Sequence, residues 1–162
     1  MLAGEPIADY TYDGGNHSRD HARNRWQTRL VGERIVKAYE YKGSVYLACA
    51  SQKVLRLSPE GDCCAYAYVQ HVNNPEALFD ATVLRVDDLE VTKSMHEAAV
   101  EEYRAEHEYD PDVLDIWGHR INTTRGTCVF DCRTSHNGYY SGSFTASLVG
   151  VVPVGASLLV ER

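Results

Sequence analysis

The chain has 162 residues, and 16 basic against 23 acidic side chains give it a formal net charge of −7. This length fits one domain with a core of its own. The acidic balance argues against a general nucleic-acid binder, which needs clustered cations to displace counterions from phosphates. No apolar stretch approaches the ~20 residues of a membrane span. We therefore expect neither a nucleic-acid nor a membrane partner.

Residues 1–29 are expected to form a polar N-terminal arm that precedes a single β-rich domain at 30–162. The arm carries a local charge of +3 in its second half, while the rest of the chain is acidic. Its basic side chains are Arg19, Arg23, Arg25 and Arg29. A basic arm on an acidic body indicates a contact surface for another chain or for the body itself.

The first part of the domain is expected to form short strands separated by turns. Apolar alternation predicts strands at 34–41, 44–50, 53–57, 64–70 and 82–91. Lys42 and Gly43 predict a tight hairpin turn, and residues 58–62 predict a loop. Pro75 favours the first position of a short helix at 75–80.

The strongest helix signal covers about 94–107 and is acidic. Ser94 and Glu97 match the capping-box pattern, in which each side chain reaches the backbone N–H of the other residue. The apolar stripe is thin, chiefly Met95, Ala99 and Tyr103. A thin stripe predicts a helix that lies on the surface of the sheet.

The last third of the chain is again β-rich. Strands are expected at 113–123, 126–133, 139–149 and 151–160. Together these elements predict an α+β fold, predominantly antiparallel β-sheet, with one acidic surface helix and the short helix near 75–80.

The chain has five cysteines, an odd number, and no N-terminal pattern of a secretory signal. We therefore expect free thiols in a reducing compartment. Cys128 and Cys132 fall on the apolar face of their strand and lie too far apart to share a metal ion. Cys63 and Cys64 are adjacent, so their side chains point to opposite faces, and burial is the simpler interpretation. We expect no metal site and no cofactor, with Cys49 as a further free thiol.

The candidate binding hairpin spans residues 135–140. Asn137 and Gly138 form the strongest short hairpin signal in the chain. His136, Tyr139 and Tyr140 would stand at its tip, where one of the two tyrosines could fill a pocket of a partner.

Trp117 and His119 form a second candidate site. They share one face of a strand, and His119 beside Trp117 could act as a general acid or base in a pocket. The simpler interpretation is a core tryptophan next to a surface histidine.

Four motifs together resemble an uncharacterised domain family of phage and bacterial genomes, over roughly residues 30–149. They are Leu30-Val31-Gly32, Asp62-Cys63-Cys64, residues 117–127 and Asn137-Gly138-Tyr139-Tyr140. The resemblance implies an α+β domain and a phage or prophage setting, hence the cytoplasm of a bacterial host cell or a virion. It implies no reaction.

Three functions fit these observations. The first is a non-enzymatic phage accessory protein that binds a host or defence protein, or a small molecule. The second is a virion or assembly protein whose basic arm contacts the acidic helix, at Glu97 and Glu101, of a neighbouring copy. The third is a small enzyme that uses His119 or the cysteines. The first is the hypothesis we favour, and homo-oligomerisation is expected under both of the first two.

Overall fold

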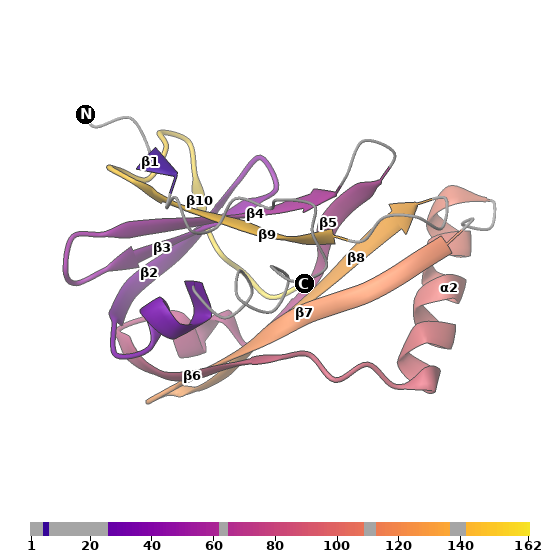
Figure 1. The fold of residues 1–162 in the computed structure, drawn as a ribbon, viewed down its shortest axis with the longest axis horizontal. Coiled ribbons are helices and arrows are strands. Elements are labelled where there is room, and N and C mark those ends of the chain that lie inside the picture. The colour runs from indigo at the N-terminus through magenta and orange to yellow at the C-terminus, as the bar shows by residue number, and fades with distance from the viewer. Residues whose placement is uncertain (1–4, 7–25, 62–64, 109–112, 137–141) are drawn as a thin grey trace.

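The computed structural model describes residues 5–6, 26–61, 65–108, 113–136 and 142–162. The fold is mostly antiparallel β-sheet with few helices, which confirms the predicted α+β class (Figure 1). Residues 26–30 are helical. The remaining elements are β1 (Glu5–Pro6), β2 (Arg34–Tyr41), β3 (Ser44–Cys49), β4 (Val54–Gly61), β5 (Tyr66–Asn73), η1 (Pro75–Leu78), β6 (Ala81–Asp88), α2 (Lys93–His107), β7 (Val113–Thr123), β8 (Gly126–His136), β9 (Gly142–Val149) and β10 (Ser157–Leu158).

The strands follow one another in the order β1-β9-β4-β3-β2-β6-β7-β8-β5, with β10 beside β2. We call β1, β9, β4, β3, β2 and β10 the first sheet, and β6, β7, β8 and β5 the second sheet. The two sheets are joined through β2, whose Arg34 and Ile35 pair with Thr82 and Ala81 of β6. This short junction lets the second sheet fold back over the first.

The C-terminal residues link the two sheets on the side away from this junction. The Leu159 N–H donates to the carbonyl of Ala38 on β2. Arg162 and Val72 of β5 exchange a pair of backbone hydrogen bonds of 2.9 and 3.1 Å. The expected strand at 151–160 is therefore wrong in extent. Only Ser157–Leu158 forms a strand, because the chain has to cross from one sheet to the other.

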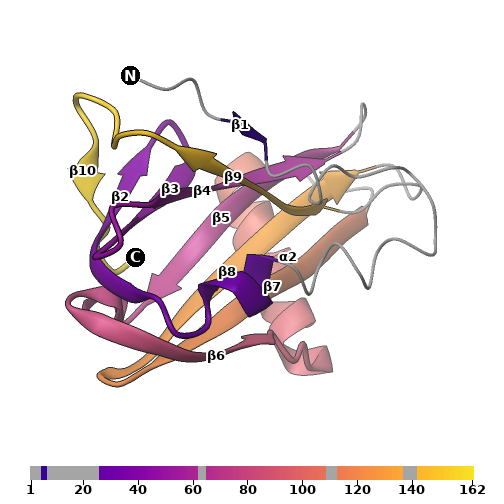
Figure 2. The ribbon, with the colours of Figure 1, turned by 60° about the vertical axis from the view of Figure 1, so that its left-hand side comes forward.

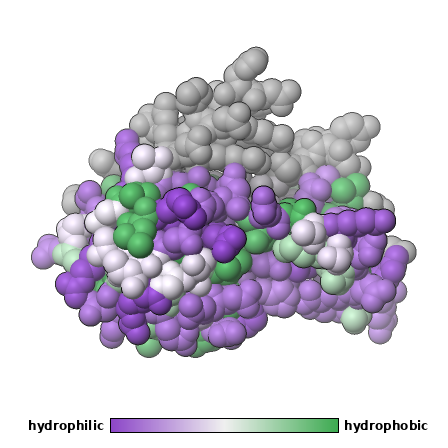
Figure 3. All heavy atoms as spheres, turned by 90° about the horizontal axis from the view of Figure 1, so that it is seen from below, coloured by the Kyte–Doolittle hydropathy of each residue, from purple (hydrophilic) through white to green (hydrophobic). Residues whose placement is uncertain are grey.

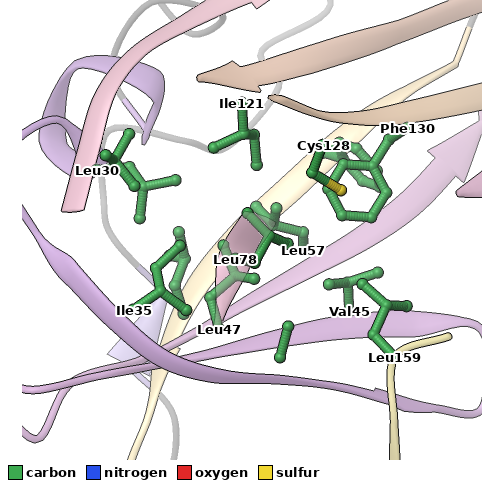
Figure 4. Close-up of a cluster of buried hydrophobic side chains, with 14 of the residues drawn as sticks. Leu30, Ile35, Val45, Leu47, Leu57, Leu78, Ile121, Cys128, Phe130 and Leu159 are labelled. Atoms are coloured by element: carbon green, nitrogen blue, oxygen red, sulfur yellow. The ribbon is translucent and has the colours of Figure 1, made fainter. Parts of the chain in front are cut away.

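The core lies between the two sheets (Figure 4). Inward side chains of both sheets meet there, and the largest fully buried ones include Phe130, Ile35, Leu47, Leu57 and Ile121. Cys128 and Cys132 are both fully buried, which confirms that they fall on the apolar face of β8. Their burial follows from strand alternation, since every second residue of β8 faces the first sheet.

The turn chemistry predicted from the sequence is confirmed at two places. Lys42 and Gly43 both have positive φ, 48° and 80°, which suits the two-residue turn between β2 and β3. Pro75 opens the 3₁₀ helix η1, where a missing backbone N–H costs nothing.

The prediction of a loop at 58–62 is wrong for residues 58–61, because β4 continues to Gly61. Residues 58–61 pair with β9, whereas the pairing of β4 with β3 ends at Leu57. Pro59 therefore lies where β4 has a neighbour on one side only, the position in a sheet that tolerates proline.

Other boundaries also differ from expectation. β5 continues to Asn73 rather than ending at 70, β8 continues to His136 rather than ending at 133, and β6 ends at Asp88 rather than at 91. Helix α2 begins at Lys93, and its N-cap is Thr92, whose Oγ1 accepts a hydrogen bond from the Met95 N–H. The predicted capping box of Ser94 and Glu97 is therefore wrong, because both residues lie inside the helix.

Candidate functional site: an aromatic cluster and the pocket beside it

An aromatic cluster surrounds His119 on the inner side of the second sheet. The Trp26 ring meets the His119 ring edge-on with 4.9 Å between centroids, and Phe144 lies 5.6 Å from His119. Trp117 packs edge-on against Phe144 at 5.1 Å, and its Nε1–H donates to Thr134 Oγ1 at 2.8 Å. Trp117 and His119 do share one face of β7, as the sequence predicts, and helix 26–30 and β9 supply the other rings.

The polar edge of His119 is held by Gln27. Gln27 Nε2 lies 2.9 Å from His119 Nδ1 and donates to Asp88 Oδ1 at 3.2 Å. Asp88 Oδ1 in turn lies 3.3 Å from His119 Nδ1, so an amide and a carboxylate both meet this edge of the ring. His119 is only 6% exposed, whereas Trp117 is partly buried. The expectation of a surface histidine is therefore wrong, and the ring serves as a packed member of the cluster.

A pocket of about 80 Å³ opens beside the cluster, with Trp26 as its shared wall. This is several times the ~10–15 Å³ that a cavity needs to hold one water molecule. Its apolar lining comes from helix 26–30, β3, β4 and β9. The lining residues are Trp26, Leu30, Cys49, Leu55 and Leu148, with Arg29, Glu33 and Lys53 adding charge.

Charged side chains stand at the mouth of the pocket. Arg29 and Lys53 are exposed, and Glu33 accepts hydrogen bonds from Lys53 Nζ at 3.4 Å and from Ser51 Oγ at 2.9 Å. An apolar group that enters the interior would therefore pass charged side chains of both signs at the rim.

Cys49 is part of the pocket wall, and its thiol is not a reactive nucleophile. Burial, reinforced by the negative charge of Glu33, raises the pKa of the Cys49 thiol to about 11. Burial likewise raises the pKa of Cys128 to about 12 and that of Cys132 well above its usual value. The three described thiols are free and protonated at neutral pH, so they offer no thiolate nucleophile. Cys63 and Cys64 lie outside the described residues.

The predicted binding hairpin can be placed only in part. His136 ends β8, is 8% exposed, and its Nε2 lies 2.7 Å from Asp115 Oδ2 on β7. It is therefore a buried strand residue rather than a residue of an exposed tip. Asn137, Tyr139 and Tyr140 lie outside the described residues, so their binding role stays a prediction.

The predicted contact between the basic arm and the acidic helix also stays a prediction. Arg19, Arg23 and Arg25 lie outside the described residues, whereas Arg29 is exposed on helix 26–30. Glu97 and Glu101 are exposed on α2.

The described surface seen from below is mostly hydrophilic, with small separate hydrophobic patches (Figure 3).

Helix α2 itself is held by a charged network on the outer face of the second sheet. Arg133, 5% exposed, forms a two-bond fork with Asp131 at 2.9 Å and lies 3.5 Å from Glu102. Glu102 also pairs with His71 at 2.9 Å and accepts a hydrogen bond from Gln70. Burial alone would raise the pKa of Glu102, but these hydrogen bonds and the charges of His71 and Arg133 outweigh it and lower the pKa below its usual 4.5.

Two properties of the described residues bear on the class of site. No three His, Cys, Asp or Glu side chains within them come together in a way that could hold a metal ion. None of their helices is long and apolar enough to cross a membrane.

The sequence interpretation missed the contribution of helix 26–30, which it assigned to the arm. Trp26 and Leu30 are 3% and 2% exposed and belong to the core. Their spacing of four residues, which places two apolar side chains on one helical face, was the available signal. Gln27 gave no signal, because its partner His119 is 92 residues away in the sequence.

The comparisons with known proteins match the chain to a family model but to no individual protein. A family model described as a domain of unknown function, DUF7448, matches residues 28–146. No curated protein and no solved structure matches the chain. The chain therefore belongs to the DUF7448 family.

Proposed function

We propose that this member of the DUF7448 family acts by binding, without a catalytic step, and that the pocket beside Trp26 receives an apolar side chain of a protein partner. The pocket carries the proposal, since apolar residues of three strands and one helix line a cavity that reaches the surface. Pockets of this kind are where binding energy concentrates in protein interfaces.

The chemistry of the lining supports binding rather than catalysis. The thiol that faces the pocket, Cys49, has a pKa raised to about 11 and stays neutral. The ring behind the pocket wall, His119, is buried and engaged by Gln27. The apolar lining favours an aliphatic group, so we expect a partner segment that presents an aliphatic side chain to the pocket.

The first experiment measures whether the pocket takes such a group. Leucine methyl groups are labelled with ¹³C, and the protein is titrated with N-acetyl-leucine and, separately, with N-acetyl-leucine amide. We expect saturable shifts at Leu30, Leu55 and Leu148 with both probes. Because the lining is mostly apolar, the two forms should bind with affinities within about 5-fold of each other, the range for an exposed charge contact.

A matched pair of variants locates the binding. Leu148→Phe fills the pocket and should abolish the shifts at Leu30 and Leu55. Leu84→Phe makes the same change at an exposed position of β6 and should leave them intact. Shifts that do not saturate, or that persist in Leu148→Phe, would refute the pocket as the binding site.

The wider setting is part of the same proposal. On the resemblance described above, we propose a phage-encoded accessory protein whose partner is a protein of the bacterial host. Homo-oligomerisation stays a prediction, and so does the virion role. Native mass spectrometry at low and high salt tests both, because a contact between a basic arm and an acidic helix should weaken as salt screens it.

A further inference from the structure

A row of polar and aromatic side chains crosses the face of the first sheet that is turned away from the core. The registers place Tyr39 of β2 opposite Tyr46 of β3, Tyr46 opposite Arg56 of β4, and Arg56 opposite Ser147 of β9. Directly opposite residues have Cβ atoms about 4.5–5.5 Å apart and share one face. Leu55, Leu57 and Ala146 alternate with this row and belong to the core.

Two polar atoms in this row are buried without a partner among the described residues. They are the Arg56 Nε and the Ser147 Oγ, and Ser147, which pairs with Pro6 of β1 on its other side, is only 5% exposed. A buried donor without an acceptor destabilises the fold, and proteins rarely leave two such atoms on facing residues. The two atoms belong to facing residues, so one acceptor between the strands could satisfy both.

We propose that Arg56 and Ser147 form an anion site, which binds a carboxylate or phosphate group of a ligand. The Arg56 guanidinium and the Ser147 hydroxyl would each donate a hydrogen bond to the same oxyanion. Tyr46, 6% exposed, lies opposite Arg56 and forms the wall of the site on the β3 side, with Tyr39 next to it on β2.

The charge around Arg56 agrees with an anionic ligand. No ion pair joins Arg56 to a carboxylate within the described part of the chain. Glu60 lies four residues further along β4, about 13 Å away at the rise of a strand. Its carboxylate accepts a hydrogen bond from Thr145 Oγ1 at 2.9 Å. Arg56 is thus a half-buried cation without an ion pair to the described carboxylates.

This site is independent of the pocket beside Trp26. Leu55 and Leu148, which line the pocket, precede Arg56 and follow Ser147, so they point to the opposite face of the same strands. Either site can therefore fail its test without affecting the other.

The test observes the Arg56 Nε–H group directly in ¹H–¹⁵N spectra of the labelled full-length chain. Its signal is assigned as the one lost in Arg56→Gln. The protein is titrated with inorganic phosphate and, in a second series, with acetate, both at constant ionic strength. We expect the Arg56 signal to move in a saturable way, while that of exposed Arg120 on β7 moves little and without saturation.

Ser147→Ala keeps Arg56 and removes the second donor. It should weaken anion binding roughly 2- to 10-fold, the range for one hydrogen bond. Tighter binding of phosphate would assign a phosphorylated ligand, and tighter binding of acetate a carboxylate, and both support the site. An Arg56 signal that behaves like that of Arg120, or an affinity unchanged in Ser147→Ala, would overturn the proposal.

Discussion

Helix 26–30 and helix α2 lie on opposite sides of the second sheet and are attached to it by different chemistry (Figure 2). The five residues of helix 26–30 bury Trp26 and Leu30 in the core. The fifteen residues of α2 bury only Ala99 and Tyr103, which pack against Leu114 of β7.

Charged groups make up for this small apolar contact. Glu102 of α2 meets Arg133 and His71 on the outer face of the sheet, and Arg133 is in turn held by Asp131. The attachment of helix 26–30 should therefore respond to lost volume, and that of α2 to lost charge and to pH. We therefore expect α2 to separate from the sheet before helix 26–30 does under acid conditions.

The largest expected effect is that of Trp26→Ala. Truncating a buried tryptophan costs about 3–5 kcal/mol of the free energy of unfolding, because a cavity remains. The cavity would disrupt both the aromatic cluster around His119 and the wall of the pocket. Urea denaturation followed by circular dichroism measures the loss. A cost below about 1 kcal/mol would show that helix 26–30 is not part of the core.

Arg133→Met comes next, at about 3 kcal/mol, because it leaves the carboxylates of Asp131 and Glu102 without their buried cation. The same substitution at exposed Arg120 should cost less than about 0.5 kcal/mol. Amide hydrogen exchange would show where the loss falls. We expect faster exchange along α2 and unchanged exchange in β3. Equal acceleration in both elements would contradict a local role.

A smaller effect should follow from pH alone. Since the pKa of Glu102 is lowered in the folded state, its contribution is fully present above the unfolded pKa, near 4.5, and is lost as pH falls through the folded value. We expect the amides of α2 to lose protection below pH 4.5 before those of helix 26–30 do. Glu102→Gln should remove this difference, and a variant that keeps it would contradict the assignment.

The sequence predicts much of this fold because alternation is local. It identifies the cores of β2 and β7 and the burial of Cys128 from neighbouring residues alone. Pro59 shows the limit of such local prediction. A proline fits a strand where the neighbouring strand has already ended, and here the pairing with β3 ends at Leu57, which residues near Pro59 do not reveal.

The candidate site is less predictable because its contacts are distant in the sequence. Trp117 and His119 can be placed on one face of a strand, but Gln27 and Phe144 reach them from other elements. The unpaired Arg56 and Ser147 carry no local pattern at all, and only the pairing of β4 with β9 brings them together.

The smallest expected effect distinguishes two capping residues of α2. Thr92 Oγ1 accepts a hydrogen bond of 3.3 Å from the Met95 N–H, whereas Ser94 lies one residue inside the helix. Thr92→Ala should therefore cost about 1 kcal/mol, the usual value of an N-cap. Ser94→Ala should change stability by a few tenths of a kcal/mol at most, because alanine suits a helix interior. Thermal unfolding of the two variants side by side measures the difference, and a larger loss in Ser94→Ala would restore the capping box that the sequence predicts.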